Sequence, residues 1–265
     1  MTLTAARPRV RRLPSFSLLP LVGLVAGLVI WWLAIASLSR LNPILADFSP
    51  TSAFSNLASL LTSGVLVRHI VASLIRVFFG LTFAVLIALP LGLILGLRHK
   101  LELATSAVFQ FIRMISPLSW MPIAVMVFGV GDLPVFFLLT IAAVWPILLT
   151  TITAVRGVDP LYLRLARSFA AEPLEIVGRI ILPSIQPAVL SSIRVAVGLI
   201  WVVLVPAEML GVSSGLGYLI LDCRDRLAYG ELTAVLLVIG LIGWGLDTAL
   251  RLWNQGSFAA TAGQR

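Results

Sequence analysis

Long stretches of this chain carry apolar residues on every face that a helix would present. From 81 to 97 the sequence reads LTFAVLIALPLGLILGL, without the alternation of polar and apolar positions typical of membrane barrel strands. A charge at the centre of a bilayer is costly, and about 20 apolar residues suffice to span it as a helix. The pattern predicts six membrane-spanning helices, over 16–38, 69–97, 103–128, 133–155, 187–210 and 232–253.

Composition indicates a protein whose solvent is the bilayer. Of the 265 residues, 60% are hydrophobic and 11% are charged, whereas soluble domains carry about 25% charged residues. So little polar material could not cover the surface of a soluble globule, and intrinsic disorder is excluded more firmly still. We therefore expect an all-α, polytopic membrane protein.

The basic residues predict the orientation of these spans. Twelve Lys and Arg residues fall on one side of the predicted topology and four on the other, and basic loops face the cytoplasm. Both termini are therefore expected in the cytoplasm, with a basic segment over 1–15, a first span and its external loop over 16–67, a membrane core over 68–253 and a tail over 254–265. This topology explains the net charge of +8, so the charge does not indicate nucleic acid as a partner.

The start of the chain admits a second interpretation, because its basic stretch and apolar run loosely imitate a cleaved signal peptide. Ala34-Ile35-Ala36 would supply the cleavage site. The uncharged run over 13–39 is long for the apolar region of a signal peptide. We therefore expect this segment to be retained as the first span.

Residue types that hold metal ions or nucleotides are scarce. Cys223 is the only cysteine, and no cluster of Cys and His has zinc-site spacing. The only lysine, Lys100, follows His99 rather than the glycine of a phosphate-binding loop. We expect neither catalytic residues nor a cofactor or metal in this chain, so active transport would need a partner ATPase or an ion gradient.

Proline and glycine interrupt the predicted spans. Each of the prolines removes a helix hydrogen bond and tends to kink or end the helix, which is compatible either with packing irregularity or with broken helices that line a cavity. Gly92 and Gly96 have the spacing of a close helix contact. The prolines in apolar context are Pro90, Pro117, Pro122, Pro146 and Pro206.

The cytoplasmic segment over 156–183 is too long for a tight turn. Asp159 followed by Pro160 predicts a helix start, and Leu161, Leu165 and Phe169 then recur at a spacing of four, as on one face of a short amphipathic helix. A second short helix is expected from Pro173 until just before Pro183. The segment is either a surface loop packed on the bilayer or a rigid helix-turn-helix that transmits force to a partner.

This segment resembles the coupling loop of permease subunits of binding-protein-dependent ABC importers. That loop shows Glu-Ala-Ala, three residues, Gly, nine residues and Ile-x-Leu-Pro, and the chain matches it with Ala166 and with IILP over 180–183. Arg164 and Leu165 replace its Glu-Ala, and Ala170 replaces its glycine. The resemblance implies an ATPase contact through Arg164, Ala166, Arg167, Ser168, Phe169, Ala170, Ala171, Glu172 and Pro173.

The resemblance extends over 68–253 and is strongest to the nitrate, sulfonate (taurine) and bicarbonate branch of these permeases. It rests on ASLIRVFFG over 72–80, PLGLILGL over 90–97, IRMISPLSWMPIAVMVFGVGD over 112–132 and PAEMLGVSSGLGYLI over 206–220. It implies the type I ABC permease fold and a pathway for a small oxyanion, although permeases for pyrimidine or flavin compounds share much of the pattern.

The same resemblance implies the setting in which the chain works. It implies a bacterial inner-membrane protein that contacts lipid, assembles as a homodimer and docks cytoplasmic ATPase subunits, which hold ATP and Mg. An extracytoplasmic substrate-binding protein would deliver the substrate, with docking near the charged residues 222–226. An ion-coupled transporter using Glu208 and Asp247 and a membrane scaffold without transport are the alternatives.

Charged residues inside spans mark candidate pathway positions, because such groups face the bundle interior or a water-filled cavity. Arg76 and Arg194 either reach the headgroups or pair with Glu208. Arg113 lies deeper, just before the Pro117–Pro122 break, where a guanidinium that keeps its charge would favour an anion. The candidate pathway residues are Arg76, Arg113, Trp120 and Glu208.

Overall fold

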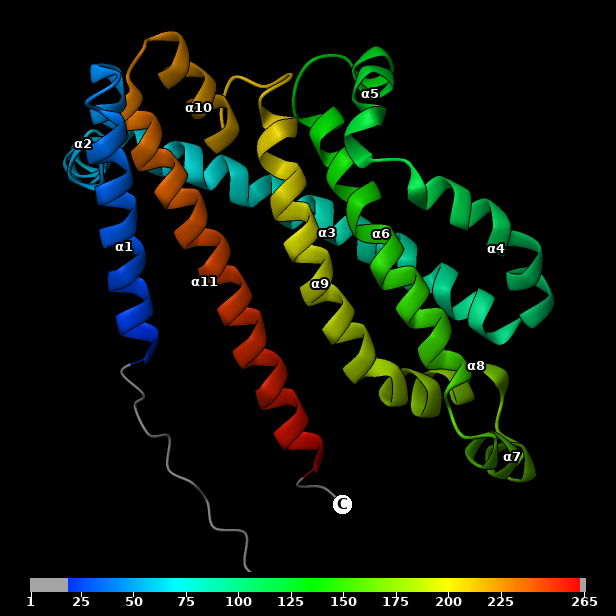
Figure 1. The fold of residues 1–265 in the computed structure, drawn as a ribbon. Helices are drawn as coiled ribbons and strands as arrows, with labels where there is room; N and C mark the ends of the chain where they lie inside the picture. Colours follow the sequence, from blue (N-terminus) through cyan, green and yellow to red (C-terminus); the bar gives the residue numbers. More distant parts are fainter. Residues whose placement is uncertain (1–18, 263–265) are drawn as a thin grey trace, which may run out of the picture.

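The computed structural model describes residues 19–262, and every regular element among them is helical. The all-α expectation is confirmed for this part of the chain. Figure 1 shows the elements in order. They are α1 (Leu19–Leu38), η1 (Pro43–Phe48), α2 (Pro50–Thr62), α3 (Val65–Leu97), α4 (His99–Met114), η2 (Pro117–Trp120), α5 (Met121–Phe128), α6 (Asp132–Arg156), α7 (Pro160–Ser168), α8 (Pro173–Ile176), η3 (Val177–Ile181), α9 (Leu182–Glu208), α10 (Leu216–Asp225) and α11 (Tyr229–Ala262).

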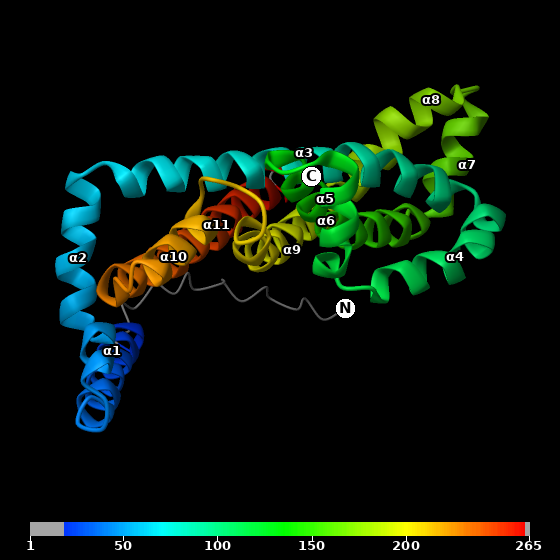
Figure 2. The ribbon, with the colours of Figure 1, turned by 90° about the horizontal axis from the view of Figure 1, so that it is seen from above.

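Helices α3, α6 and α9 form the core, and Figure 2 shows α3 as one layer with α6, α9 and α11 beside it. Glycines on α3 permit its close approach to α6: a Cβ atom on Gly80, Gly92 or Gly96 would lie 2.6–2.7 Å from the Cβ atom of a facing α6 residue. The predicted close helix contact at Gly92 and Gly96 is therefore confirmed. The core side chains are fully buried aliphatic groups such as Leu138, Leu139, Ile147, Ile200 and Leu204.

The span predicted over 103–128 is not one straight helix. Helix α4 ends at Met114, and the pair α4 and η2–α5 is bent by 87°. Ser116 takes extended backbone angles because the ring of Pro117 disfavours a helical conformation at the preceding residue. Of the two interpretations of the prolines, this segment follows the broken helix.

Four described helices are long and apolar enough to cross a membrane, or five if the bent α4–α5 pair counts as one span. The first predicted span, over 16–38, corresponds to α1, whose described side chains begin at Val22 and form a shorter apolar helix to Leu38. The predicted segment 1–15 and the last three residues of the predicted tail 254–265 lie outside the described residues, and so does the start of the first span.

The expectation that a helix stops before Pro183 was wrong. Helix α8 continues through the π-helical turn η3 into α9, and the N–H of Leu182 bonds to the carbonyl of Val177. Pro183 has no N–H to give to the preceding turn, and its ring would clash with a carbonyl in α-helical register. One π turn shifts that register, so the helix passes the proline without ending.

Two short helices at one end of the molecule were missed by the sequence analysis. Ser49 caps α2 by accepting a hydrogen bond from the N–H of Ser52, and Pro50 occupies the first turn. Helix α10 follows the loop after α9 and packs on α11 and α9. Both lie at the end opposite α7 and α8, whereas the described start of α1 and the end of α11 point toward the α7–α8 end (Figure 1). This agrees with both termini lying on one side.

Candidate functional site

The segment over 156–183 begins its first helix where the sequence predicts. The carboxylate of Asp159 accepts a 2.8 Å hydrogen bond from the N–H of Leu161, and Pro160 is the first residue of α7. Helix α8 begins at Pro173 with a capping box, in which Glu172 and Glu175 satisfy each other's backbone N–H groups. The two helices and their turn therefore form one compact unit.

The turn between α7 and α8 is built around Ala170, which lies in the left-handed region with φ of 56°. The N–H of Ala171 bonds to the carbonyl of Ala166, and the N–H of Ala170 bonds to the carbonyl of Arg167. These two bonds are those of a Schellman motif, whose left-handed position favours glycine. Ala170 thus takes a backbone conformation that favours glycine, at the position where the resemblance leads us to expect a glycine.

The apolar face predicted for α7 points away from the rest of the chain. Leu161, Leu165 and Phe169 are 57%, 55% and 79% exposed, and Leu174 at the start of α8 is 82% exposed. Ala166 is the buried residue of α7 and anchors the helix. The nine predicted coupling residues all lie in this projecting unit, which therefore presents an uncovered apolar surface.

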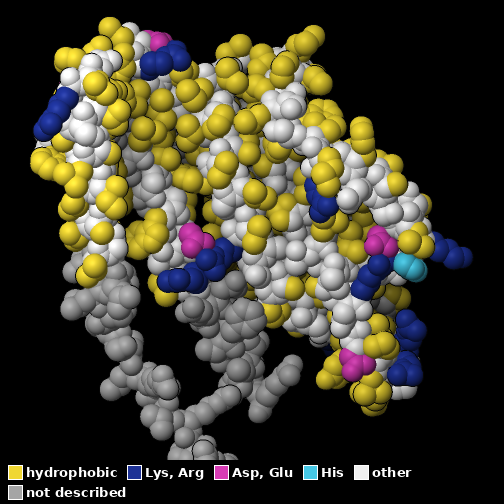
Figure 3. All heavy atoms as spheres, in the orientation of Figure 1, with side chains coloured by type: hydrophobic (Ala, Val, Ile, Leu, Met, Phe, Trp, Pro, Cys, Tyr) yellow, Lys and Arg dark blue, Asp and Glu magenta, His cyan; other side chains and the backbone are white. Residues whose placement is uncertain are grey.

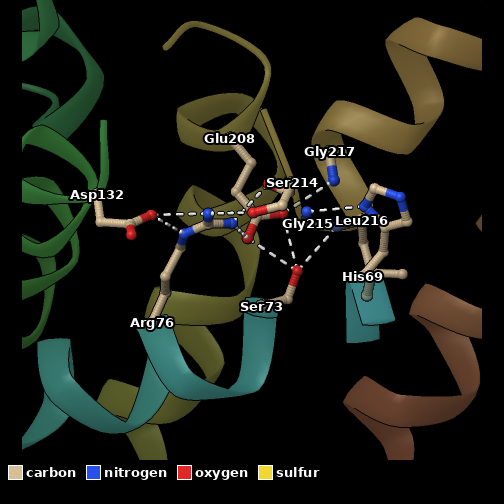
Figure 4. A network of polar contacts seen from close by, with 9 residues as sticks. All are labelled: His69, Ser73, Arg76, Asp132, Glu208, Ser214, Gly215, Leu216 and Gly217. Carbon is tan, nitrogen blue, oxygen red and sulfur yellow. Dashed lines mark hydrogen bonds and ion pairs between the residues drawn. The ribbon is translucent and has the colours of Figure 1, made fainter. Parts of the chain in front are cut away.

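At the other end of the molecule, a buried polar network joins α3 to α9 and to the loop over 209–215 (Figure 4). Glu208 is fully buried, and its carboxylate accepts hydrogen bonds from Arg76, from Ser73 Oγ at 2.8 and 2.9 Å, and from the N–H of Gly217 at 2.9 Å. The Arg76 Nη1 to Glu208 Oε1 distance is 2.7 Å. The pairing alternative for Arg76 is therefore confirmed.

Every nitrogen of the Arg76 guanidinium contacts an acceptor. Nη1 and Nη2 donate to the carbonyl and hydroxyl oxygens of Ser214 at 2.7 and 2.9 Å, and Nε donates to Asp132 Oδ1 at 2.8 Å. Asp132 opens α6 and is 57% exposed, so it is the outward side of the network. One buried cation thus faces two carboxylates, and the network carries no spare positive charge.

Gly215 in the loop after α9 and Gly217 in the first turn of α10 let the backbone pack closely on this network and on α9. Gly215 has φ of 110°, and a Cβ atom there would lie 2.4 Å from Arg76 Nη1. A Cβ atom on Gly217 would lie 2.3 Å from the carbonyl oxygen of Val205. His69 Nδ1 accepts from the N–H of Gly215 at 3.0 Å, which anchors the loop to α3.

Sequence reasoning did not find His69, Ser73, Asp132 or Ser214 as members of this network. The hydrogen bonds of this network join residues up to 146 positions apart along the chain, and short polar side chains in apolar surroundings are common. The sequence offered one indication of such partners: a buried arginine needs a hydrogen-bond acceptor for each of its donor groups.

Arg113 lies in the last turn of α4, beside a cavity of about 340 Å³ between α4, η2, α6 and α9. Its Nη2 donates to Gln110 Oε1 at 3.2 Å, and it forms no ion pair with a described side chain. Trp145 and Pro146 of α6 and Leu199 of α9 are among the apolar residues that line this cavity. Arg113 is exposed, so its predicted depth in the membrane stays a prediction, and the structure places it beside this cavity.

The other intramembrane candidates have different surroundings. Trp120 packs on the core, and its indole N–H is buried without a hydrogen-bond partner in the described part of the chain. Arg194 pairs with Asp247 through two bonds of 2.7 and 2.9 Å, not with Glu208. The two carboxylates invoked for an ion-coupled transporter are thus each held by an arginine.

Helix α10 and the residue after it carry the charged residues over 222–226, which form ion pairs. Arg226 bridges Asp222 at 2.8 Å and Glu231 at 3.0 Å, and these bonds raise its pKa further. Cys223 lies buried beneath them, and burial together with the nearby Glu231 raises the pKa of its thiol to about 11. No group of three or more His, Cys, Asp or Glu among the described residues could hold a metal ion.

Residues 88–256 match the family described as binding-protein-dependent transport system inner membrane component. The chain belongs to this family. The permease is 32% identical over 243 residues to a bicarbonate transport system permease of Synechococcus elongatus, covering 87% of this chain and 85% of the relative. It is 34% identical over 189 residues to a nitrate import permease of the same organism, covering 70% and 68% of the two chains.

A third relative is a putative aliphatic sulfonates permease of Bacillus subtilis, 28% identical over 232 residues, with 88% of this chain and 84% of the relative covered. The fold matches a chain of the MetNI methionine ABC transporter, in a structure described as inward facing, with a TM-score of 0.63 and 20% identity over 72% of this chain and 95% of that chain. These matches confirm the expected family, the ABC permease fold and the role as a transporter subunit rather than an enzyme.

Proposed function

We propose that this permease forms half of the pathway of an ATP-driven importer and passes a small anion delivered by a substrate-binding protein. The observation that carries the proposal is the uncovered apolar surface of α7 and α8, which includes Phe169 and Leu174. Helices α7 and α8 project together, with a capped start and a hydrogen-bonded turn. A partner protein that moves one of these helices therefore moves both. Two cytoplasmic ATPase subunits, which hold ATP and Mg, dock on this surface in two copies of the chain.

The external end supplies the opposite gate of the same pathway. Arg76 and Glu208 hold α3 and α9 together, Asp132 connects them to α6, and the Ser214 loop covers them. When the pathway opens toward the outside, these contacts either separate or move together. Along the chain, Trp120 on η2 lies between Arg113 and Asp132. The binding protein docks over α10 and the 209–215 loop.

The setting follows from the family and from the predicted topology. The protein spans a bacterial cytoplasmic membrane with both termini in the cytoplasm, and two copies assemble side by side. The relatives named as nitrate, bicarbonate and sulfonate permeases favour an anionic substrate. The carboxylates of Glu208 and Asp247 are both engaged by arginines, which favours ATP over an ion gradient as the energy source.

Affinity purification of the tagged chain from its native membranes tests this proposal. An ATP-binding subunit should copurify with the unchanged chain and be lost from Phe169→Ser and Leu174→Ser variants, because each substitution removes apolar contact area. The matched control is Leu41→Ser, which changes a residue that is 85% exposed at the other end of the molecule. Retention of the subunit by all variants, or transport by the isolated chain without ATP, would overturn the proposal.

A further inference from the structure

An ion pair joins the first turn of α4 to the last residue of α6. The carboxylate of Glu102 on α4 accepts a hydrogen bond from the guanidinium of Arg156, which ends α6 and lies 54 positions further along the chain. The Nδ1 atom of His99 is a second acceptor for the same guanidinium nitrogen, because a guanidinium only donates. Figure 3 shows acidic, basic and His side chains adjoining at this edge of the molecule. Of the ion pairs between described residues, this is the one that ties α4 to another helix.

Helix α4 is weakly anchored in the rest of the chain. None of its residues is buried, and Arg98 alone separates it from α3. Two turns beyond the ion pair, Phe109 stacks near Trp145 of α6 with ring centroids 5.9 Å apart. At its other end, α4 stops at the 87° bend that precedes η2 and α5. The position of α4 therefore depends on the ion pair and on this aromatic contact.

Arg156 lies at the base of the projecting unit formed by α7 and α8. Val155 and Val158, on either side of it, are buried in one apolar cluster, and Leu163 of α7 and Ile176 of α8 pack against that cluster. Side chains packed at the density of a protein interior transmit a displacement instead of absorbing it. A displacement of α7 and α8 is therefore expected to move the guanidinium of Arg156 as well.

From these contacts we infer that Glu102 is a positioning residue: its ion pair with Arg156 makes α4 follow the movement of α7 and α8 during the import cycle. This rests on the proposed docking of ATPase subunits, and it adds a second route to the direct one, which runs from α8 through η3 into α9. The side chains of Glu102 and Arg156 are 20% and 34% exposed, so water screens this pair less than a pair on the open surface. Because Arg113 in the last turn of α4 lines the cavity between α4, η2, α6 and α9, a shift of α4 moves one wall of that cavity.

A purely local role for Glu102 makes a different prediction. An acidic residue in the first turn of a helix stabilises that helix through the helix dipole, with no need of a partner on another helix. In that case a substitution of Arg156 would leave α4 unaffected. The inference requires instead that changes on either side of the ion pair reach the other helix.

Hydrogen exchange of the purified complex with its copurified ATPase, with and without the nonhydrolysable ATP analogue AMP-PNP, tests this inference. In the unchanged complex, AMP-PNP should alter exchange over both 160–171 and 99–106. Glu102→Gln should reduce the nucleotide-dependent change over 99–106 to less than half, while 160–171 still responds. Arg156→Gln should have the same effect, and the double variant should be no more severe than either single variant, because the two side chains act through one contact.

The isolated chain gives a second measurement that needs no ATPase. Arg156→Gln and Glu102→Gln should each accelerate exchange over 99–106 by up to about fivefold, the range for a partly exposed ion pair. The matched control is Lys100→Gln, which removes one charge from the same turn, where Lys100 is exposed and forms no ion pair with a described residue. It should leave both the exchange rate and the response to AMP-PNP unchanged.

An undiminished response to AMP-PNP over 99–106 in Glu102→Gln, or additive effects in the double variant, would overturn the inference. So would unchanged exchange over 99–106 in the isolated Arg156→Gln chain, which would leave Glu102 with a local role at the start of α4. The proposed function fails differently, through absence of a copurifying ATPase. The isolated chain still decides in that case whether the ion pair ties α4 to α6, so the two failures are distinguishable.

Discussion

At the scale of single residues, Ala170 has an unfavourable backbone conformation in the turn between α7 and α8, the helices that we propose as the ATPase contact. Its φ of 56° costs an L-residue about 1 kcal/mol or more relative to glycine. Glycine would add freedom to the unfolded chain, which offsets part of the gain. The net effect of Ala170→Gly is therefore expected to be a stabilisation of about 0.5–1 kcal/mol.

Amide hydrogen exchange over 160–171 measures the stability of this turn directly. Global unfolding of the whole membrane protein would be less sensitive to so local a change. Ala170→Gly should slow exchange at the end of α7, and Ala170→Val should accelerate it because a β-branched residue fits the left-handed region poorly. Ala171→Gly is the control, since Ala171 does not have a positive φ. Equal exchange in the Ala170→Gly variant and the unchanged chain would show that the turn is not strained.

The two carboxylates that contact Arg76, those of Glu208 and Asp132, should differ sharply in their contribution to stability. Glu208→Gln leaves the buried Arg76 without its fully buried counter-charge, and breaking such a pair costs about 3–5 kcal/mol. Asp132→Asn should cost less than about 1 kcal/mol, because Asp132 is 57% exposed and screened by solvent. The unfolding midpoint in detergent gives both values, and similar losses for the two variants would contradict the assignment of Glu208 as the structural partner.

At the scale of elements, the packing of α3 on α6 depends on the absence of side chains at defined positions. A Cβ atom on Gly92 would lie 2.6 Å from Thr151 Cβ and 3.2 Å from the carbonyl oxygen of Leu148. Neither contact is the flexible end of a side chain, so the helices must separate. Gly92→Ala should destabilise the protein by about 1–3 kcal/mol, as overpacking does elsewhere.

Gly240 of α11 provides the matched control, because nothing lies within 4 Å of a Cβ atom built there. Gly240→Ala should be neutral or stabilise the helix by up to about 1 kcal/mol, from helix propensity alone. Thermal unfolding of both variants in the same detergent makes the comparison. A Gly92→Ala protein as stable as the unchanged chain would show that the contact between α3 and α6 is looser than these distances imply.

Elements with a strong local signal could be predicted from the sequence, and those set by distant partners could not. The start of α7 at Pro160 follows from Asp159 and from the proline itself. The continuation past Pro183 depends on a π turn, which no local pattern announces. Helices α2 and α10 are short and contain both polar and apolar residues. A search for long apolar runs therefore does not detect them.

The residues of the candidate site also divide into those that a local pattern predicts and those that depend on distant partners. The α7 surface was predictable because its residues lie within one short stretch of the sequence. Asp132 was missed as the partner of Arg76 because the two lie 56 residues apart, and Asp247 was missed as the partner of Arg194 at a separation of 53. Which carboxylate an arginine reaches is decided by how the helices pack, and single-sequence patterns do not encode that.

At the scale of the whole molecule, the two ends both expose apolar side chains and differ in their charged groups. The end with α7 and α8 presents exposed Arg164 and Arg167, whereas the end with α10 presents ion pairs beside a closed polar network. If α7 and α8 face the cytoplasm, then α2 and α10 face the outside, and the Arg113 cavity lies between the two. The predicted orientation therefore ties each proposed role to one side of the membrane.

The single thiol of the chain makes this orientation directly measurable. Cys223 is buried, and raising its pKa from 9.0 to about 11 lowers its thiolate fraction about 100-fold at neutral pH. The unchanged chain should therefore stay unlabelled by a membrane-impermeant maleimide while folded and become labelled once denatured. That behaviour gives a clean background for cysteines placed elsewhere.

Ser55→Cys on α2 and Ser168→Cys at the end of α7 change exposed residues at opposite ends of the molecule. In intact cells the impermeant maleimide should label the first variant and not the second, and both should react after the membrane is permeabilised. The asymmetry follows from basic loops remaining on the cytoplasmic side. The reverse pattern would place the coupling surface outside the cell, where no ATP-binding subunit could reach it, and would refute the orientation together with the docking role of α7 and α8.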